Sequence, residues 1–114
     1  GIGVLLGIRI GAIVAFRDFL VRYPQSPLAS NAQYWIGYSF YAQRDYKSAL
    51  VQQKKLLADY PASAKVPDAL LNVAANQIHL DDLAGAKKTL QLLLAEHPAS
   101  TAAGLAKRRL DALQ

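Results

Sequence analysis

The sequence predicts an all-α fold, a solenoid of paired helices that repeats every 37 residues. Pro24, Pro61 and Pro98 are separated by 37 residues and again by 37, and each lies in the same Tyr/His-Pro-x-Ser motif. Apolar residues at helical spacing precede each proline, whereas no useful length of the chain alternates between apolar and polar residues as a strand would. A fixed period of this size is the sequence signature of a repeat architecture.

Composition limits the chain to one well-packed domain. It has 114 residues, of which 53% are hydrophobic and 18% charged, so it can bury a core and is not an intrinsically disordered chain. The absence of cysteine excludes disulfides, thiolate metal sites and cysteine nucleophiles. A solenoid of short helices explains the high apolar content, because nearly every helix carries an apolar seam.

The first ten residues, GIGVLLGIRI, are set apart from the rest by their hydrophobicity. The longest apolar stretch, 1–14, is interrupted by Arg9 and falls short of the roughly 18 to 20 residues that a membrane-spanning helix needs. We expect residues 1–10 to be a degenerate N-terminal segment, either the remnant of a first-repeat helix packed on the domain or the remnant of a secretion signal.

The repeat domain is expected over residues 11–114. It contains the second helix of repeat one at 11–23, repeat two at 28–60, repeat three at 65–97 and a closing helix at 101–113 that caps the solenoid. Each proline ends the helix before it, and Ser26 or Ser63 can then begin the next helix by capping free backbone N–H groups. Short polar turns at 43–45 and 81–82 separate the two helices of a unit.

A small residue stands twelve positions before each proline, at Ala12, Ala49 and Ala86. Two antiparallel helices can approach closely only where one of them carries a small side chain. Large residues one and two turns further on, such as Leu56 and Leu93, then fill the space beside the crossing. These positions form a core and carry no chemistry.

The repeat resembles the tetratricopeptide repeat, which folds as a right-handed superhelix of helix-turn-helix units. The matching residues of the middle unit are Ile36, Gly37, Phe40, Ala49 and Pro61. Gln33 stands where that family often has tryptophan, and Gln53 replaces a large aromatic of the second helix.

Two longer strings, NAQYWIG at 31–37 and KRRLDAL at 107–113, resemble the C-terminal domain of the Tol-Pal system YbgF family, also called CpoB. The resemblance implies a non-enzymatic periplasmic adaptor. Such an adaptor binds TolA and helps to coordinate outer-membrane constriction with the septal peptidoglycan synthesis machinery in cell division. It also implies a possible homo-oligomer, a trimer formed through a coiled coil that these residues do not contain. The alternative is a BamD-like structural subunit of an outer-membrane protein assembly machine, a family with similar repeats.

A partner-binding groove is expected along the first helix of each unit, which lines the concave face in tetratricopeptide arrays. Tyr34, Tyr38 and Tyr41 share one stripe of the middle unit by their spacing of four and three. The full set of expected groove residues is Asn31, Tyr34, Tyr38, Tyr41, Asp68, Leu71, Ile78, His79 and Arg108. The alternative is that the tyrosines only pack against neighbouring helices. We expect Trp35 to be buried between units.

No other cluster predicts chemistry. The basic clusters at 54–55, 87–88 and 107–109 lack interleaved aromatic residues, so we expect solvated helix faces and no nucleic-acid partner. Asp81 and Asp82 are expected to begin a helix rather than to hold a metal. No nucleophile, base and orienting group can be assembled, so no catalytic site, metal or cofactor is expected, and we expect no membrane insertion.

Overall fold

The computed structural model describes the backbone of residues 2–114 and the side chains of residues 11–114. Within this part the fold consists of helices alone, which confirms the predicted all-α repeat. The helices are α1 (Ile2–Arg22), α2 (Ala29–Ala42), α3 (Tyr46–Asp59), α4 (Val66–His79), α5 (Leu83–Glu96) and α6 (Thr101–Leu113). The pairs α2–α3 and α4–α5 fall within the ranges expected for repeats two and three.

The N-terminal segment is not a separate element. The backbone of residues 2–10 continues without a break into residues 11–22, and together they form α1. No proline interrupts this stretch, and a single glycine such as Gly11 lowers helix stability without ending a helix. The boundary expected at residue 10 therefore falls inside a helix.

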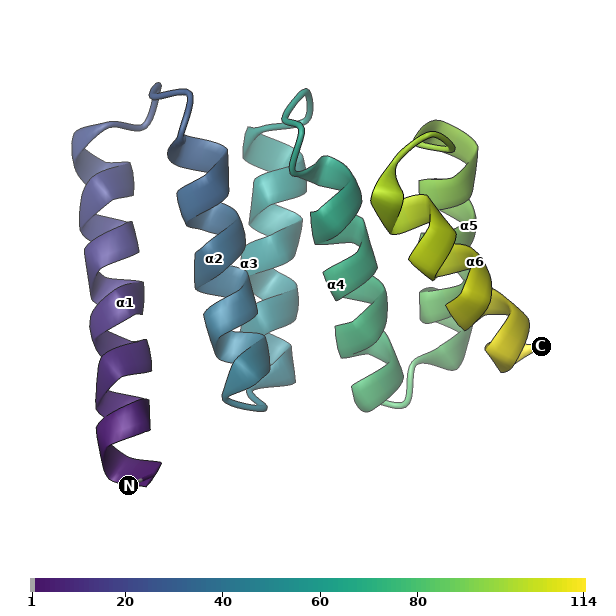
Figure 1. Ribbon diagram of the computed structural model, residues 1–114, viewed down its shortest axis with the longest axis horizontal. Coiled ribbons are helices and arrows are strands. Elements are labelled where there is room, and N and C mark those ends of the chain that lie inside the picture. Colours follow the sequence, from purple (N-terminus) through teal and green to yellow (C-terminus); the bar gives the residue numbers. More distant parts are fainter. Residues whose placement is uncertain (1) are drawn as a thin grey trace.

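The helices stack in chain order, each packed antiparallel against the next (Figure 1). Helices α2, α4 and α6 form one layer, and α3 and α5 lie behind them. α2 also contacts α4, and α4 contacts α6, so the first helices of successive units touch directly. α1 packs against α2 and, among the described residues, against no other helix.

The three proline motifs form the same turn at one end of the stack (Figure 1). In each motif the serine N–H donates to the carbonyl three residues earlier at 3.1 Å, that of Tyr23, Tyr60 or His97. Proline suits the second position of such a turn because its ring presets φ. The expected helix caps at Ser26 and Ser63 were wrong, because the Ser26 hydroxyl accepts from the Leu28 N–H and the Ser63 hydroxyl from the Lys65 N–H, in the turns before α2 and α4. Ser100, the third serine of the motif, does cap α6 by accepting from the Ala103 N–H.

The turns at the other end also repeat with the period. Arg44 and Asp81, 37 residues apart, take positive φ values of 64° and 61°. The next residues then cap the second helix of each unit, because the Asp45 carboxylate accepts from the Ser48 N–H and that of Asp82 from the Gly85 N–H. Asp82 thus begins α5, as expected.

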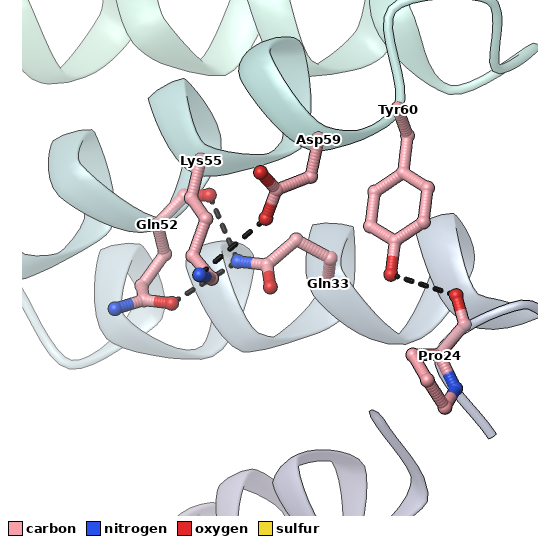
Figure 2. A network of polar contacts seen from close by, with 6 residues as sticks. All are labelled: Pro24, Gln33, Gln52, Lys55, Asp59 and Tyr60. Atoms are coloured by element: carbon pink, nitrogen blue, oxygen red, sulfur yellow. Dashed lines mark hydrogen bonds and ion pairs between the residues drawn. The ribbon is translucent and has the colours of Figure 1, made fainter. Parts of the chain in front are cut away.

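Buried glutamines replace the aromatic residues of the tetratricopeptide pattern. The Gln33 side-chain amide donates to the backbone carbonyl of Gln52 at 2.9 Å and to its side-chain oxygen at 3.0 Å (Figure 2). The Gln53 amide donates back to the Tyr34 carbonyl at 3.1 Å. Because both glutamines are fully buried, these hydrogen bonds between α2 and α3 offset part of the cost of removing the amides from water, whereas the Gln53 side-chain oxygen is buried without a hydrogen bond among the described residues.

The main apolar core lies in the C-terminal half of the chain. Its buried members come from α3, α4, α5 and α6, with Leu56, Leu90 and Leu93 fully enclosed. The crossing alanines Ala49 and Ala86 are also fully buried. Of the α1 side chains that the structure describes, only that of Ile13 is buried.

Candidate functional site

A continuous series of aromatic rings runs along α2 and on to its neighbours. The ring centroids of Tyr34 and Tyr38 are 6.1 Å apart, and those of Tyr38 and Tyr41 are 5.8 Å apart. Tyr41 contacts Tyr46 at the start of α3, and Tyr46 stacks on His79 at the end of α4, with centroids 4.1 Å apart and planes nearly parallel. The series follows from the sequence spacing, since residues three and four apart share one face of a helix.

The tyrosine stripe forms one wall of a groove of about 170 Å³ between α2, α4 and α6. The residues that line it are Tyr34, Tyr38, Tyr41, Asp68, Leu71, Asn72, Ala75 and Arg109. Tyr38 keeps 40% of its surface exposed. The tyrosines therefore pack against one another and also line the groove, and their role in binding a partner stays a prediction.

The polar groups of the groove include an oriented amide. The Asn76 amide donates to the Asn72 side-chain oxygen at 3.1 Å, and both residues are buried. This contact occupies the oxygen of Asn72, so its own N–H groups are left as donors at the groove wall. Asp68 supplies a carboxylate and Arg109 a guanidinium from α6. Together these groups can pair with the N–H and C=O groups of a peptide backbone.

Tyr34 is a half-buried titratable group in the groove wall. Its removal from water, then the nearby Asp68 carboxylate and then Tyr38 raise its pKa from 10.0 to about 12. The Lys65 ammonium lies 5.0 Å from the centre of the Tyr34 ring and 3.8 Å from the Asp68 carboxylate. Tyr34 therefore stays a neutral phenol, able to donate a hydrogen bond, at any physiological pH.

Five of the nine expected groove residues line this groove, namely Tyr34, Tyr38, Tyr41, Asp68 and Leu71. The other four lie elsewhere. Asn31 lines a separate cavity between α1 and α2. His79 extends the aromatic series beyond the groove lining, and Ile78 is half-buried outside that lining.

The residue that α6 contributes to the groove was predicted one position too early in the sequence. Arg108 is exposed and does not line the groove, whereas Arg109 does. One step along a helix rotates a side chain by about 100°, so neighbouring residues face different directions. The 37-residue period leads to Arg108, the counterpart of the groove-lining Tyr34 and Leu71, whereas Arg109 is the counterpart of Asn72, which lines the groove, and of Trp35, which does not.

The expectation that Trp35 is buried between units was wrong. Trp35 is 42% exposed and lines the cavity between α1 and α2. Its indole contacts the edges of Tyr34 and Tyr38 at centroid distances of 5.3 and 5.5 Å. Trp35 thus joins this second cavity to the tyrosine groove.

Within the described residues, no group of three or more His, Cys, Asp or Glu side chains gathers in a way that could hold a metal ion. The same part of the chain contains no helix that is both long enough and apolar enough to cross a membrane.

The repeated helix pairs and the groove along their first helices define a tetratricopeptide-like α-helical repeat domain. More specifically, residues 10–113 match the family described as YfiO, outer membrane lipoprotein, and the chain belongs to that family. The match supports the tetratricopeptide-like fold and does not single out YbgF. Comparison with curated proteins found no significant match.

Proposed function

We propose that this domain is a non-enzymatic protein-binding module that holds an extended segment of a cell-envelope protein in the tyrosine groove. The observation that carries the proposal is the open tyrosine stripe of α2 facing polar groups of α4 and α6. Tyrosine suits recognition because it offers a large apolar face and a hydroxyl group while losing little rotamer entropy. Asn72, Asp68 and Arg109 provide donors and an acceptor for the backbone of a bound segment.

Membership of an outer membrane lipoprotein family supports a periplasmic location and a role in outer-membrane biogenesis. In this setting the partner is a component of the outer-membrane protein assembly machinery, and the domain acts as a docking subunit. A second candidate partner is TolA, with a role in coordinating outer-membrane constriction with septal peptidoglycan synthesis. The strings at 31–37 and 107–113 favour this candidate, since they resemble the YbgF family.

Binding to purified partners tests the groove. Titration calorimetry would measure the affinity of the 114-residue chain for a soluble TolA segment and for soluble parts of outer-membrane assembly proteins. We expect the double variant Tyr34→Ala, Tyr38→Ala to weaken binding by tenfold or more, at about 1 to 2 kcal/mol for each lost anchor. The matched control is Tyr23→Ala, which removes an exposed tyrosine outside the groove.

The partner that binds distinguishes the two candidates. Unchanged affinity of the folded double variant, or equal losses in the double variant and in Tyr23→Ala, would contradict the groove assignment whichever partner is used.

A further inference from the structure

A small basic pocket lies between α1, α2 and α3 and shares no lining residue with the tyrosine groove. Its volume is about 220 Å³. Its lining residues are Arg17, Phe40, Lys47, Ser48, Val51 and Gln52. Phe40 and Val51 provide apolar surface, and each of the other four side chains can donate a hydrogen bond. Among the described residues, no carboxylate lines the basic pocket.

The two cations of the basic pocket form no ion pair with any described residue. The Arg17 guanidinium lies 5.6 Å from the centre of the Phe40 ring, which keeps it beside the pocket. The acidic residues nearest in sequence are engaged elsewhere. The Asp18 carboxylate pairs with Arg22 at 3.1 Å, and the Asp45 carboxylate caps the start of α3. The pocket therefore keeps two positive charges that these neighbours do not neutralise.

The neutral donors of the pocket are also free, and one of them is oriented. The Gln52 side-chain oxygen accepts from the Gln33 amide at 3.0 Å, so the Gln52 nitrogen lies on the side of the amide away from Gln33 (Figure 2). Among the described residues, neither this nitrogen nor the Ser48 hydroxyl has a hydrogen-bond partner. Because its oxygen is occupied, Gln52 offers the pocket donors alone. The polar groups of the pocket therefore suit an anion.

The equivalent place one repeat later lacks this chemistry. A shift of 37 residues replaces the lysine and the serine of the pocket by Ala84 and Gly85. The counterpart of Gln52 is Thr89, whose hydroxyl donates to the Gln77 side-chain oxygen at 2.7 Å. There the neutral polar groups bond to each other. The free donors of the basic pocket are therefore not a general property of the repeat.

We propose that the basic pocket binds a phosphate group. The planar guanidinium of arginine can donate two parallel hydrogen bonds to phosphate oxygens, and the lysine ammonium adds a second charge. Four donor groups suit the three acceptor oxygens of a phosphate better than the two of a carboxylate. Phe40 and Val51 contact the carbon atoms attached to the phosphate. Val51 is 62% exposed, so the pocket is open to a phosphate carried by a lipid headgroup or by a small molecule.

Nuclear magnetic resonance of the isotope-labelled 114-residue chain, titrated with glycerol phosphate at constant ionic strength, tests the proposal. We expect saturable shifts of the Ser48 N–H and the Gln52 side-chain amide, with a dissociation constant of about 1 mM or lower. Arg17→Gln and Lys47→Gln should each raise this constant at least about fivefold. The matched control is Lys54→Gln, which should change it less than about twofold, because Lys54 is the 37-residue counterpart of Arg17 and lies outside the pocket. Circular dichroism checks that the variants fold.

Vesicles distinguish the two sources of the phosphate. If a lipid headgroup is the ligand, the chain co-sediments with phosphatidylethanolamine–phosphatidylglycerol vesicles, and Arg17→Gln weakens this binding at least about fivefold whereas Lys54→Gln does not. If the chain binds glycerol phosphate but not the vesicles, the ligand is a small phosphorylated molecule. Binding of either probe with this dependence on Arg17 supports a phosphate site.

Three results would overturn the proposal. The first is the absence of saturable shifts with glycerol phosphate up to about 10 mM and of vesicle binding. The second is an equal loss in Arg17→Gln and Lys54→Gln, which would indicate diffuse attraction by the positive chain. The third is binding of acetate as tight as that of glycerol phosphate, which would indicate a carboxylate site. The double variant Tyr34→Ala, Tyr38→Ala should bind glycerol phosphate like the parent, because neither tyrosine lines the basic pocket.

Discussion

The end helices of the solenoid, α1 and α6, differ in how much of their surface they bury and in the surface they leave exposed. At the C-terminal end, α6 buries Ala102, Ala103, Ala106 and Leu110 against the core and turns a charged face to water. At the N-terminal end, α1 packs, among the described residues, on α2 alone, and an apolar cavity lies open between them. A polar end helix closes a repeat array, whereas an apolar one leaves a surface for another helix.

Side-chain truncation at equivalent positions of the repeats should give the largest difference in the free energy of unfolding. Leu56 and Leu93 are fully buried, whereas their counterpart Phe19 borders the open cavity. We expect Leu56→Ala and Leu93→Ala each to lower the free energy of unfolding by about 2 to 5 kcal/mol, since they leave cavities in a packed core. Phe19→Ala should cost about 1 kcal/mol, because its site is already hollow.

Urea unfolding measures these differences. If Phe19→Ala costs as much as Leu56→Ala, the N-terminal cavity is not open and the contrast between the ends fails.

Glycine replacements sharpen the comparison, because Gly37 packs closely against α3 whereas Gly11 of α1 has open space beside it. An added Cβ at Gly37 would overlap the Gln53 side chain and displace its amide from the Tyr34 carbonyl. We expect Gly37→Ala to destabilise the fold by about 1 to 3 kcal/mol. Gly11→Ala should instead stabilise it by about 0.5 to 1 kcal/mol, because alanine favours a helix and the site is open.

The melting temperatures of these two variants should therefore move in opposite directions. A Gly37→Ala protein as stable as the parent would mean that the α2–α3 contact is looser than the geometry indicates.

Loss of a serine hydroxyl should also lower the free energy of unfolding by different amounts at the two ends, and this difference is smaller. Ser100 caps α6 directly, whereas the Ser26 hydroxyl accepts from Leu28 in the turn before α2. We expect Ser100→Ala to cost about 1 kcal/mol and Ser26→Ala less than about 0.5 kcal/mol. Thermal unfolding of both variants provides the measurement, and equal losses would show that the two serines do the same work.

Much of the fold could be predicted from the proline period, because helix ends, crossing alanines and buried leucines all repeat with it. The surroundings of Trp35 could not. Its counterpart Asn72 is buried, whereas Trp35 lines the open cavity between α1 and α2, and α1 packs among the described residues on no helix other than α2. A local pattern identifies a helix face but not whether a neighbour is present to bury it.

The groove shows a similar limit on a finer scale. The spacing of Tyr34, Tyr38 and Tyr41 was enough to place them on one wall. Arg109 was missed because positions 108 and 109 differ by only one step of helix rotation, about 100°. The hydrogen bond that orients Asn72 depends on Asn76 one turn later, and no sequence pattern distinguishes it from two separate polar residues.

The ionisation of Tyr34 gives the test with the smallest expected effect. It reports how far α2 and α4 exclude water from Tyr34. The pKa of Tyr34 is raised to about 12, chiefly by loss of solvent where α2 meets α4, and then by Asp68. Between pH 10 and 12 the folded chain therefore holds a proton that the unfolded chain releases, so stability falls as pH rises through this window. Below pH 10 both states are protonated and the contribution is constant.

Ultraviolet absorption at high pH should show one tyrosine ionising about two pH units later than an unperturbed one, and Tyr34→Phe should remove that step. Asp68→Asn should lower the pKa of Tyr34 only in part, because desolvation is the larger cause. If all tyrosines of the parent ionise near pH 10 while the chain is folded, α2 and α4 do not enclose Tyr34. The α2–α4 contact is then as open as the cavity between α1 and α2.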